Sequence, residues 1–75
     1  MKTITEAEAQ QLANLLGMWI AVDDDNEVYM FKNKPHIDGN VWNQYVSSIA
    51  SDQMKRLSIR IASDRQWTEQ IWRPK

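Results

Sequence analysis

The sequence predicts an α+β fold in which an N-terminal helix packs on a small antiparallel β-sheet built from two hairpins. Three observations predict it. Apolar residues at helical spacing follow a helix-capping pattern near the N-terminus, two strand-like segments flank an acidic turn, and two further strand-like segments lie near the C-terminus. With 75 residues, of which 43% are hydrophobic, residues 1–75 are expected to form one domain. Folding at this length buries only about 60–65% of the surface that the unfolded chain exposes, so we expect a single small core.

The helix is predicted over residues 5–16. Thr5 and Glu8 have the spacing of a capping box, in which each side chain bonds the backbone N–H of the other residue. Ile4 precedes the cap and can pack on the first turns, while Gly17 can adopt the left-handed conformation that ends a helix. The apolar stripe of this helix comprises Ala7, Ala9, Leu12, Ala13, Leu15 and Leu16.

The first hairpin is predicted from residues 18–23 and 27–32. Both segments are rich in aromatic and β-branched residues, and they flank the acidic turn 24–26. Asn26 is expected at the left-handed position of the turn, because asparagine tolerates a positive φ. Large apolar side chains alternate on both faces of this hairpin. We therefore expect one face to lie on the helix and the other to be partly covered or available to a partner.

The middle of the chain is predicted to contain a loop and one ambiguous segment. Residues 33–40 include Pro35 and Gly39 and are expected to form the loop. Residues 41–50 place apolar side chains at helical spacing, yet their residue types prefer strands. A short helix or irregular turn is the preferred interpretation there, and a strand is the alternative.

The second hairpin is predicted over residues 57–72. A half-buried strand is expected over 57–62, where three large aliphatic residues alternate with Ser, Arg and Ala. Residues 63–66 resemble a turn. Residues 67–72 can then pair back as the last strand, which Pro74 ends.

Charge is unevenly distributed, although the net charge is only −1. Residues 1–53 carry three basic and eight acidic side chains, a net charge of −5. Residues 54–75 carry six basic and two acidic side chains, a net charge of +4. The preferred interpretation is that the two parts neutralise each other across one folded sheet, and the alternative is an acidic or basic contact surface.

Motifs for catalysis or metal binding are missing from the sequence. The absence of cysteine excludes a disulfide framework and a thiolate zinc site. A calcium loop that begins at Asp23 would need Gly at its sixth position and Glu at its twelfth, where the chain has Val28 and Lys34. His36 is the only histidine, with Asp38 as its nearest carboxylate in sequence, and is expected to face solvent. We expect no enzymatic activity, no catalytic residue, no cofactor and no metal.

Composition also bears on location. No segment approaches the roughly 20 apolar residues of a membrane span. The first residues lead into polar sequence rather than the apolar core of a signal peptide. We expect no membrane contact and a cytoplasmic location in a reducing compartment.

The C-terminal part mixes arginines with tryptophans, a combination that favours binding of single-stranded nucleic acid. Arg60 is expected to face solvent, because it alternates with the aliphatic residues of strand 57–62. Trp67 and Trp72 are five residues apart and would lie on opposite faces of an unbroken strand. Use of both tryptophans in the core is the preferred interpretation, because so small a domain needs them. The acidic pI of 5.7 also argues against nucleic acid as the main partner.

A recurrent pattern covers about residues 18–72. It consists of Trp19-Ile20-Ala21-Val22-Asp23, an acidic turn, Glu27-Val28-Tyr29-Met30-Phe31, Lys34-Pro35, Gly39 and Trp42, with Trp67 and Trp72 near the C-terminus. This pattern resembles the W-I-A-x-D, turn, E-x-Y-x-F, P and W sequence of small accessory proteins of tailed bacteriophages and prophages. Asn26 stands where those proteins commonly have a turn glycine. The resemblance implies binding and inhibition of a bacterial host protein, host defence included, in the host cytoplasm, and it implies no catalytic residue.

These features together predict a non-enzymatic phage or prophage accessory protein that acts by protein–protein contact. Its expected partner is a host protein, with a homodimer as a further arrangement. Nucleic acid, bound through the basic, tryptophan-containing C-terminal half, is the alternative partner. The candidate contact residues are Trp19, Tyr29, Phe31, Arg60, Arg65, Trp67 and Trp72.

Overall fold

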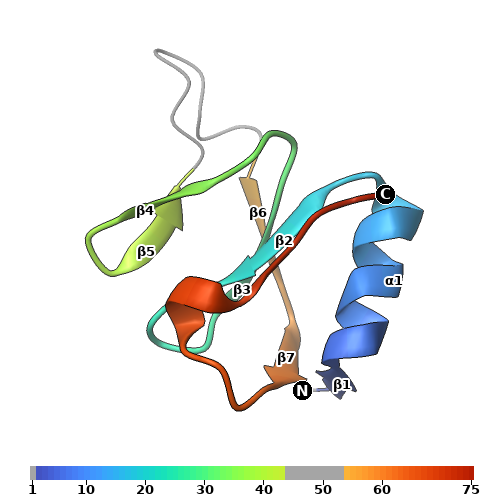
Figure 1. The fold of residues 1–75 in the computed structure, drawn as a ribbon, viewed down its shortest axis with the longest axis horizontal. Helices are drawn as coiled ribbons and strands as arrows, with labels where there is room; N and C mark the ends of the chain where they lie inside the picture. Colours follow the sequence, from blue (N-terminus) through green and yellow to red (C-terminus); the bar gives the residue numbers. More distant parts are fainter. Residues whose placement is uncertain (1, 44–53) are drawn as a thin grey trace.

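The structure, a computed structural model, describes residues 2–43 and 54–75 and has an α+β fold (Figure 1). An α-helix packs against an antiparallel sheet, as the sequence predicts. In chain order the elements are β1 (Lys2–Thr5), α1 (Glu6–Leu16), β2 (Trp19–Val22), β3 (Val28–Phe31), β4 (His36–Asp38), β5 (Val41–Asn43), β6 (Met54–Leu57), β7 (Ile59–Ala62), the 3₁₀ turn η2 (Trp67–Glu69) and β8 (Ile71–Trp72).

A four-stranded antiparallel sheet, in the order β6-β3-β2-β8, forms the centre of the molecule. Helix α1 covers one face of it, and the β4–β5 hairpin and η2 cover the other (Figure 1). Strands β1 and β7 form a separate parallel pair beside the N-terminal end of α1. The apolar residues consequently divide into two clusters, one under α1 and one under β5 and η2.

Helix α1 has the predicted caps. The Thr5 hydroxyl accepts a hydrogen bond from the Glu8 backbone N–H at 3.1 Å, and the Glu8 carboxylate accepts one from the Thr5 backbone N–H at 2.9 Å. Gly17 ends the helix with φ +64°, in the left-handed region. Residues 5–16 therefore behave as the local sequence predicts, with Thr5 as the cap and the helix itself starting at Glu6.

The apolar stripe of α1 is narrower than predicted. Ala9 and Ala13 are buried and Leu12 is partly buried, whereas Ala7, Leu15 and Leu16 are exposed. Leu15 lies about 120° around the helix axis from Ala9, because each residue turns the helix by about 100°. The helix therefore packs through its two alanines, whose small side chains allow a close approach to the sheet.

Loss of the Thr5 hydroxyl is expected to lower the free energy of unfolding by about 1 kcal/mol, because one backbone N–H of the first turn loses its acceptor. The measurement is urea denaturation of the Thr5→Ala variant. Thr3→Ala, which removes the same hydroxyl from an exposed position on β1, is the matched control. Equal midpoints for the Thr5 variant and the wild type would contradict a stabilising cap.

The first hairpin is confirmed. Strands β2 and β3 pair from Trp19 opposite Phe31 to Val22 opposite Val28, and Asn26 has φ +67° in the connecting turn. The strand residues that face α1 are Ile20, Val22, Val28 and Met30, and those on the other face are Trp19, Ala21, Tyr29 and Phe31. Both faces of the hairpin are thus covered by other parts of the chain.

The predicted loop over residues 33–40 is wrong in part. His36–Asp38 forms β4, which pairs with β5 around a turn where Gly39 has φ +66°. For residues 41–50 the preferred helix or irregular turn is also wrong where the chain is described, because Val41–Asn43 is a strand. Residues 44–50 lie outside the described residues.

The predicted second hairpin does not form. Leu57 belongs to β6, which pairs with β3, and the chain bends at Ser58 before β7. Strand β7 pairs in parallel with β1 instead of with the last strand. Residues 67–69 form the 3₁₀ turn, and β8 pairs with β2. Local patterning misses these pairings, because each of them joins segments that are far apart in the sequence.

Candidate functional site

The predicted aromatic contact residues lie mostly in the protein interior. Phe31 is fully buried and Trp72 is 5% exposed, which corrects their assignment as exposed contact residues of this chain. Trp19, Tyr29 and Trp67 are partly buried and pack on the cluster beneath β5 and η2. Burial raises the pKa of the Tyr29 phenol. The preferred core role of the C-terminal tryptophans is therefore confirmed for Trp72, and it holds in part for Trp67.

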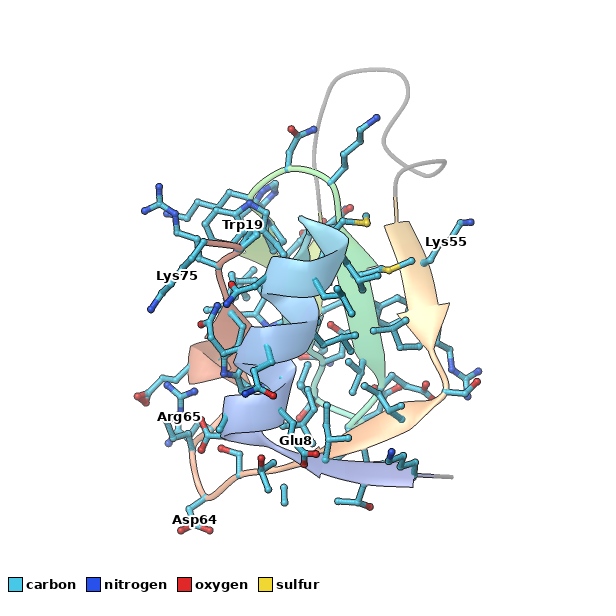
Figure 2. All side chains as sticks on the ribbon, turned by 90° about the vertical axis from the view of Figure 1, so that its right-hand side faces the viewer. Glu8, Trp19, Lys55, Asp64, Arg65 and Lys75 are labelled. Atoms are coloured by element: carbon cyan, nitrogen blue, oxygen red, sulfur yellow. The ribbon has the colours of Figure 1, made fainter. Side chains whose placement is uncertain are left out.

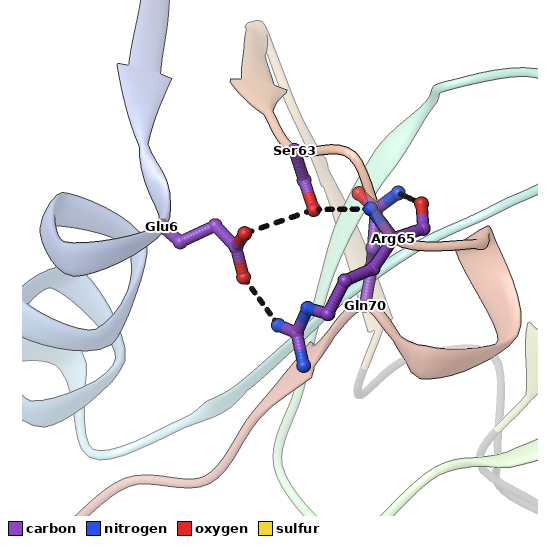
Figure 3. A network of polar contacts seen from close by, with 4 residues as sticks. All are labelled: Glu6, Ser63, Arg65 and Gln70. Atoms are coloured by element: carbon purple, nitrogen blue, oxygen red, sulfur yellow. Dashed lines mark hydrogen bonds and ion pairs between the residues drawn. The ribbon is translucent and has the colours of Figure 1, made fainter.

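Arg65 joins the β7–η2 loop to the start of helix α1 (Figure 3). Its guanidinium pairs with the Glu6 carboxylate, which also accepts a hydrogen bond from the Ser63 hydroxyl at 3.0 Å. The Arg65 backbone N–H donates to Ser63 Oγ at 3.1 Å, and the Gln70 side-chain amide donates to the Arg65 carbonyl oxygen at 2.6 Å. Because the Arg65 guanidinium also lies 5.7 Å from the centre of the Trp72 ring, this side chain has a structural role.

The ion pairs connect the acidic and basic parts of the sequence. Arg65 pairs with Glu6, and Arg56 pairs with Glu27 at 2.6 Å. Each pair joins a residue before position 54 to one after it, which supports the interpretation that the two parts neutralise each other. Arg60 has a different place: it is exposed and lines a shallow hollow of about 280 Å³ beside β7.

Three residues of the C-terminal half that were predicted to bind nucleic acid make contacts within the protein. Arg65 is paired with Glu6, Trp72 is buried, and Trp67 packs edge-on against Trp42 with ring centres 6.5 Å apart. Arg65, Trp67 and Trp72 therefore do not form one exposed face.

Asp23 is a buried carboxylate that the sequence analysis missed. It is 3% exposed, and its Oδ1 accepts a hydrogen bond from the Trp42 backbone N–H at 2.8 Å. Burial raises the pKa of the Asp23 carboxyl. The alternation of side chains along β2 could have indicated this burial, because Asp23 follows Trp19 and Ala21 on the same face of the sheet. This bond, together with the one that the Asp24 backbone N–H donates to the Asn40 carbonyl oxygen at 3.4 Å, links the β4–β5 hairpin to the end of the first hairpin.

His36 and Asp38 lie exposed on β4. The Asp38 carboxylate accepts a hydrogen bond from the Asn43 side-chain amide at 3.5 Å, the outer limit for such a bond. Among residues 2–43 and 54–75, no three His, Asp or Glu side chains gather closely enough to hold a metal ion. Within the same residues, no helix is long and apolar enough to cross a membrane.

An open groove of about 350 Å³ lies between helix α1 and the β1–β7 pair. Its apolar lining consists of Ile4, Leu12, Leu15 and Ile59. Its polar lining consists of Lys2, Glu8 and Gln11. We call this surface the α1 groove. It exists because β1, which the sequence analysis did not predict, lies next to β7 and alongside the helix.

Leu15 is the most exposed large apolar residue beside the α1 groove, at 83%. It stands in the penultimate position of α1. Exposed leucines are common one at a time, but this one adjoins a concave apolar surface with polar residues at its margin. The α1 groove is therefore the candidate functional site.

Comparison with known proteins adds no assignment to this geometry. No protein-family model, curated protein or solved structure matches the chain. Functional inference therefore rests on the described residues themselves.

Proposed function

We propose that this protein is a non-enzymatic accessory protein that acts by protein–protein contact through the α1 groove. The observation that carries the proposal is the 83% exposure of Leu15 beside an apolar groove. A chain of 75 residues has few large apolar side chains, and leaving one outside the core loses the stability that its burial would add. A bound partner would recover that burial.

The composition of the groove suits a protein partner. Protein interfaces commonly have an apolar centre and a polar rim. Ile4, Leu12 and Ile59 provide such a centre, and Lys2 and Glu8 provide charges of both signs at the rim. The matching partner surface is a protruding apolar side chain flanked by polar groups.

The proposed partner is a bacterial host protein. The resemblance to accessory proteins of tailed bacteriophages and prophages points to a bacterial host protein, host defence included, met in the host cytoplasm. A second copy of this chain is the other arrangement, because a rim with one cation and one anion can complement itself across a two-fold axis.

Leu15→Glu is expected to abolish capture of the partner. The new carboxylate would have to be desolvated in the apolar centre of the contact, whereas the free protein leaves this position in water. The measurement is affinity capture from bacterial host lysate with quantitative mass spectrometry, together with sedimentation analysis of the purified protein for self-association.

Ala7→Glu is the matched control, because it adds the same charge to an exposed position of α1 that does not line the groove. Both variants should keep the circular dichroism spectrum and the unfolding midpoint of the wild type within a few degrees. Equal recovery of every captured protein with the two variants, and a monomer in both cases, would contradict the proposed function.

A further inference from the structure

Strand β1 has one open edge. It pairs with β7 and, among the described residues, with no other strand, so that the β1–β7 pair is a two-stranded parallel sheet (Figure 1). A strand that is paired on one side directs its remaining backbone N–H and C=O groups to the other side, where another strand can bind them. Two-stranded sheets are marginally stable, and parallel pairs are slightly less stable per residue than antiparallel pairs. A further strand on β1 would therefore stabilise this part of the fold.

The capping box shows which backbone groups of β1 face the open edge. The Thr5 backbone N–H donates to the Glu8 carboxylate at 2.9 Å, so it does not point at β7. Backbone groups of residues two apart in a strand point to the same side, because the strand repeats every two residues. The N–H and C=O of Thr3 therefore face the open edge, and the Thr3 side chain is also exposed.

Opposite charges lie at the two ends of this edge. Lys2 stands at the start of β1, and the Glu8 carboxylate is held at its end by the bond from the Thr5 N–H. Figure 2 shows Glu8 in the lower part of α1, above β1. The hydrogen bond from Thr5 and, to a smaller extent, the charge of Lys2 lower the pKa of the Glu8 carboxyl, so Glu8 is anionic at neutral pH. A second β1 running antiparallel to the first would place each Lys2 beside the Glu8 of the other copy.

The other strand edges are less suited to pairing with a copy of themselves. Strand β6 carries the adjacent basic residues Lys55 and Arg56, and such charges protect an edge from pairing with another chain. Strand β8 has two residues, and the tail after it is held by α1, because the Gln10 side-chain amide donates to the Arg73 carbonyl oxygen at 2.6 Å. Strands β4 and β5 have three residues each, and β7 lies beside β3. The open edge of β1 is therefore the one whose charges complement a second copy.

We propose that two copies of this chain associate through their β1 strands, which pair antiparallel about a two-fold axis with Thr3 of one copy opposite Thr3 of the other. Opposite residues that exchange both backbone hydrogen bonds need their N–H and C=O on the same side, which Thr3 provides. The result is a four-stranded sheet in the order β7-β1-β1-β7. Both α1 helices lie on one face of it, because Lys2 and Ile4 face the α1 groove in each copy. Strands of four residues form a small interface, so this association is transient.

This association goes beyond the contact proposed for the α1 groove and does not depend on it. Leu15 stands nine residues after Glu6, about 14 Å along the helix axis from the end of β1. The β1 dimer therefore leaves Leu15 open to another protein. Leu15→Glu should keep the dimer while it loses the captured host protein, so the two proposals fail separately.

The test is disulfide cross-linking of engineered cysteines, since the chain has none of its own. Opposite residues that exchange hydrogen bonds in an antiparallel pair have Cα atoms about 5.5 Å apart, within the range of a disulfide. Under mild oxidation of the purified protein, Thr3→Cys should form covalent dimers about tenfold faster than Ala7→Cys, whose thiol has an exposed position on α1. Both variants should keep the wild-type circular dichroism spectrum. Equal rates of dimer formation would overturn the proposal.

Charge complementarity is tested in the Thr3→Cys protein. Adding Lys2→Glu should slow cross-linking about fivefold at low salt, because two attractive contacts with Glu8 become repulsive. Lys34→Glu, which makes the same reversal at an exposed position between β3 and β4, should leave the rate unchanged. Equal slowing by the two reversals would contradict the antiparallel arrangement.

Amide hydrogen exchange of the wild type gives a second measurement that needs no variant. The Thr3 N–H should exchange more slowly as protein concentration rises, because the second copy accepts its hydrogen bond. The Thr5 N–H, which is already bonded to Glu8, should not change. Constant exchange at Thr3 up to millimolar protein would overturn the proposal. Protection of Thr3 only in complex with a captured host protein would assign the edge to a strand of that protein and also overturn it.

Discussion

Replacing Phe31 with alanine is expected to lower the free energy of unfolding by about 3–5 kcal/mol. The Phe31 side chain, on β3, has no exposed surface and belongs to the same buried cluster as Trp42 of β5. Its ring also lies 6.4 Å from the Tyr29 ring at a tilt of 44°. Because a domain of this size has a total stability of only a few kcal/mol, the Phe31→Ala variant should be largely unfolded at 25 °C.

Phe31→Leu is the control for this variant, because it keeps most of the apolar volume and should cost much less than the alanine change. Urea denaturation followed by tryptophan fluorescence measures both, since Trp42 and Trp67 belong to or pack on the affected cluster. A Phe31→Ala variant with the wild-type midpoint would mean that the second face of the sheet is not a core.

Asp23→Ala is expected to cost about 1–3 kcal/mol, because it leaves the buried Trp42 backbone N–H without its acceptor. Asp23→Asn should cost less, since the amide oxygen can still accept that hydrogen bond while the buried charge is removed. The measurement is again the free energy of unfolding in urea, for both variants and the wild type at pH 7. Equal losses for the two variants would contradict a role for the hydrogen bond.

Asp23 also sets a pH dependence whose sign follows from its raised pKa. Because burial raises the pKa above its ordinary value, the folded state holds the proton more tightly than the unfolded state. This group therefore favours the folded state most below its ordinary pKa, and that contribution is lost as pH rises through the raised folded pKa. From about pH 3 to pH 7, the wild type should lose stability relative to Asp23→Asn.

Glu8 contributes a pH dependence of stability with the opposite sign. The hydrogen bond from the Thr5 backbone N–H lowers the pKa of the Glu8 carboxyl, so its contribution is present at neutral pH and is lost as pH falls through the lowered folded pKa. Subtracting the free energy of unfolding of Asp23→Asn from that of the wild type removes the Glu8 contribution, because both proteins keep Glu8. If the free energy of unfolding of the wild type increased relative to that of Asp23→Asn as pH rose, this result would contradict the burial of Asp23.

Sequence patterns predicted the features that depend on neighbours in the chain. The capping box between Thr5 and Glu8 and the left-handed Gly17 and Asn26 each involve contacts within a few residues. Such contacts form whenever the local segment folds, so residue type and spacing are sufficient to predict them. The pairing of β2 with β3 belongs to this group, because a short turn brings the two strands together.

The candidate site was not predictable in the same way. The α1 groove depends on the parallel pairing of β1 with β7, which joins Lys2 to Ile59 and Thr5 to Ala62. The residues of β1 were interpreted only as the approach to a helix cap. Leu15 was assigned to the apolar stripe, and only the packing of α1 through its alanines shows that this side chain faces solvent.

The sequence by itself determined the α+β class, the capped helix and the first hairpin, because local hydrogen bonds and side-chain alternation specify them. Only the tertiary structure decided that β8 pairs with β2 and that Asp23 accepts a hydrogen bond from Trp42. It also decided that Phe31 and Trp72 are buried. These features depend on contacts between distant segments, whose partners are selected by the packing of the whole chain rather than by any short pattern.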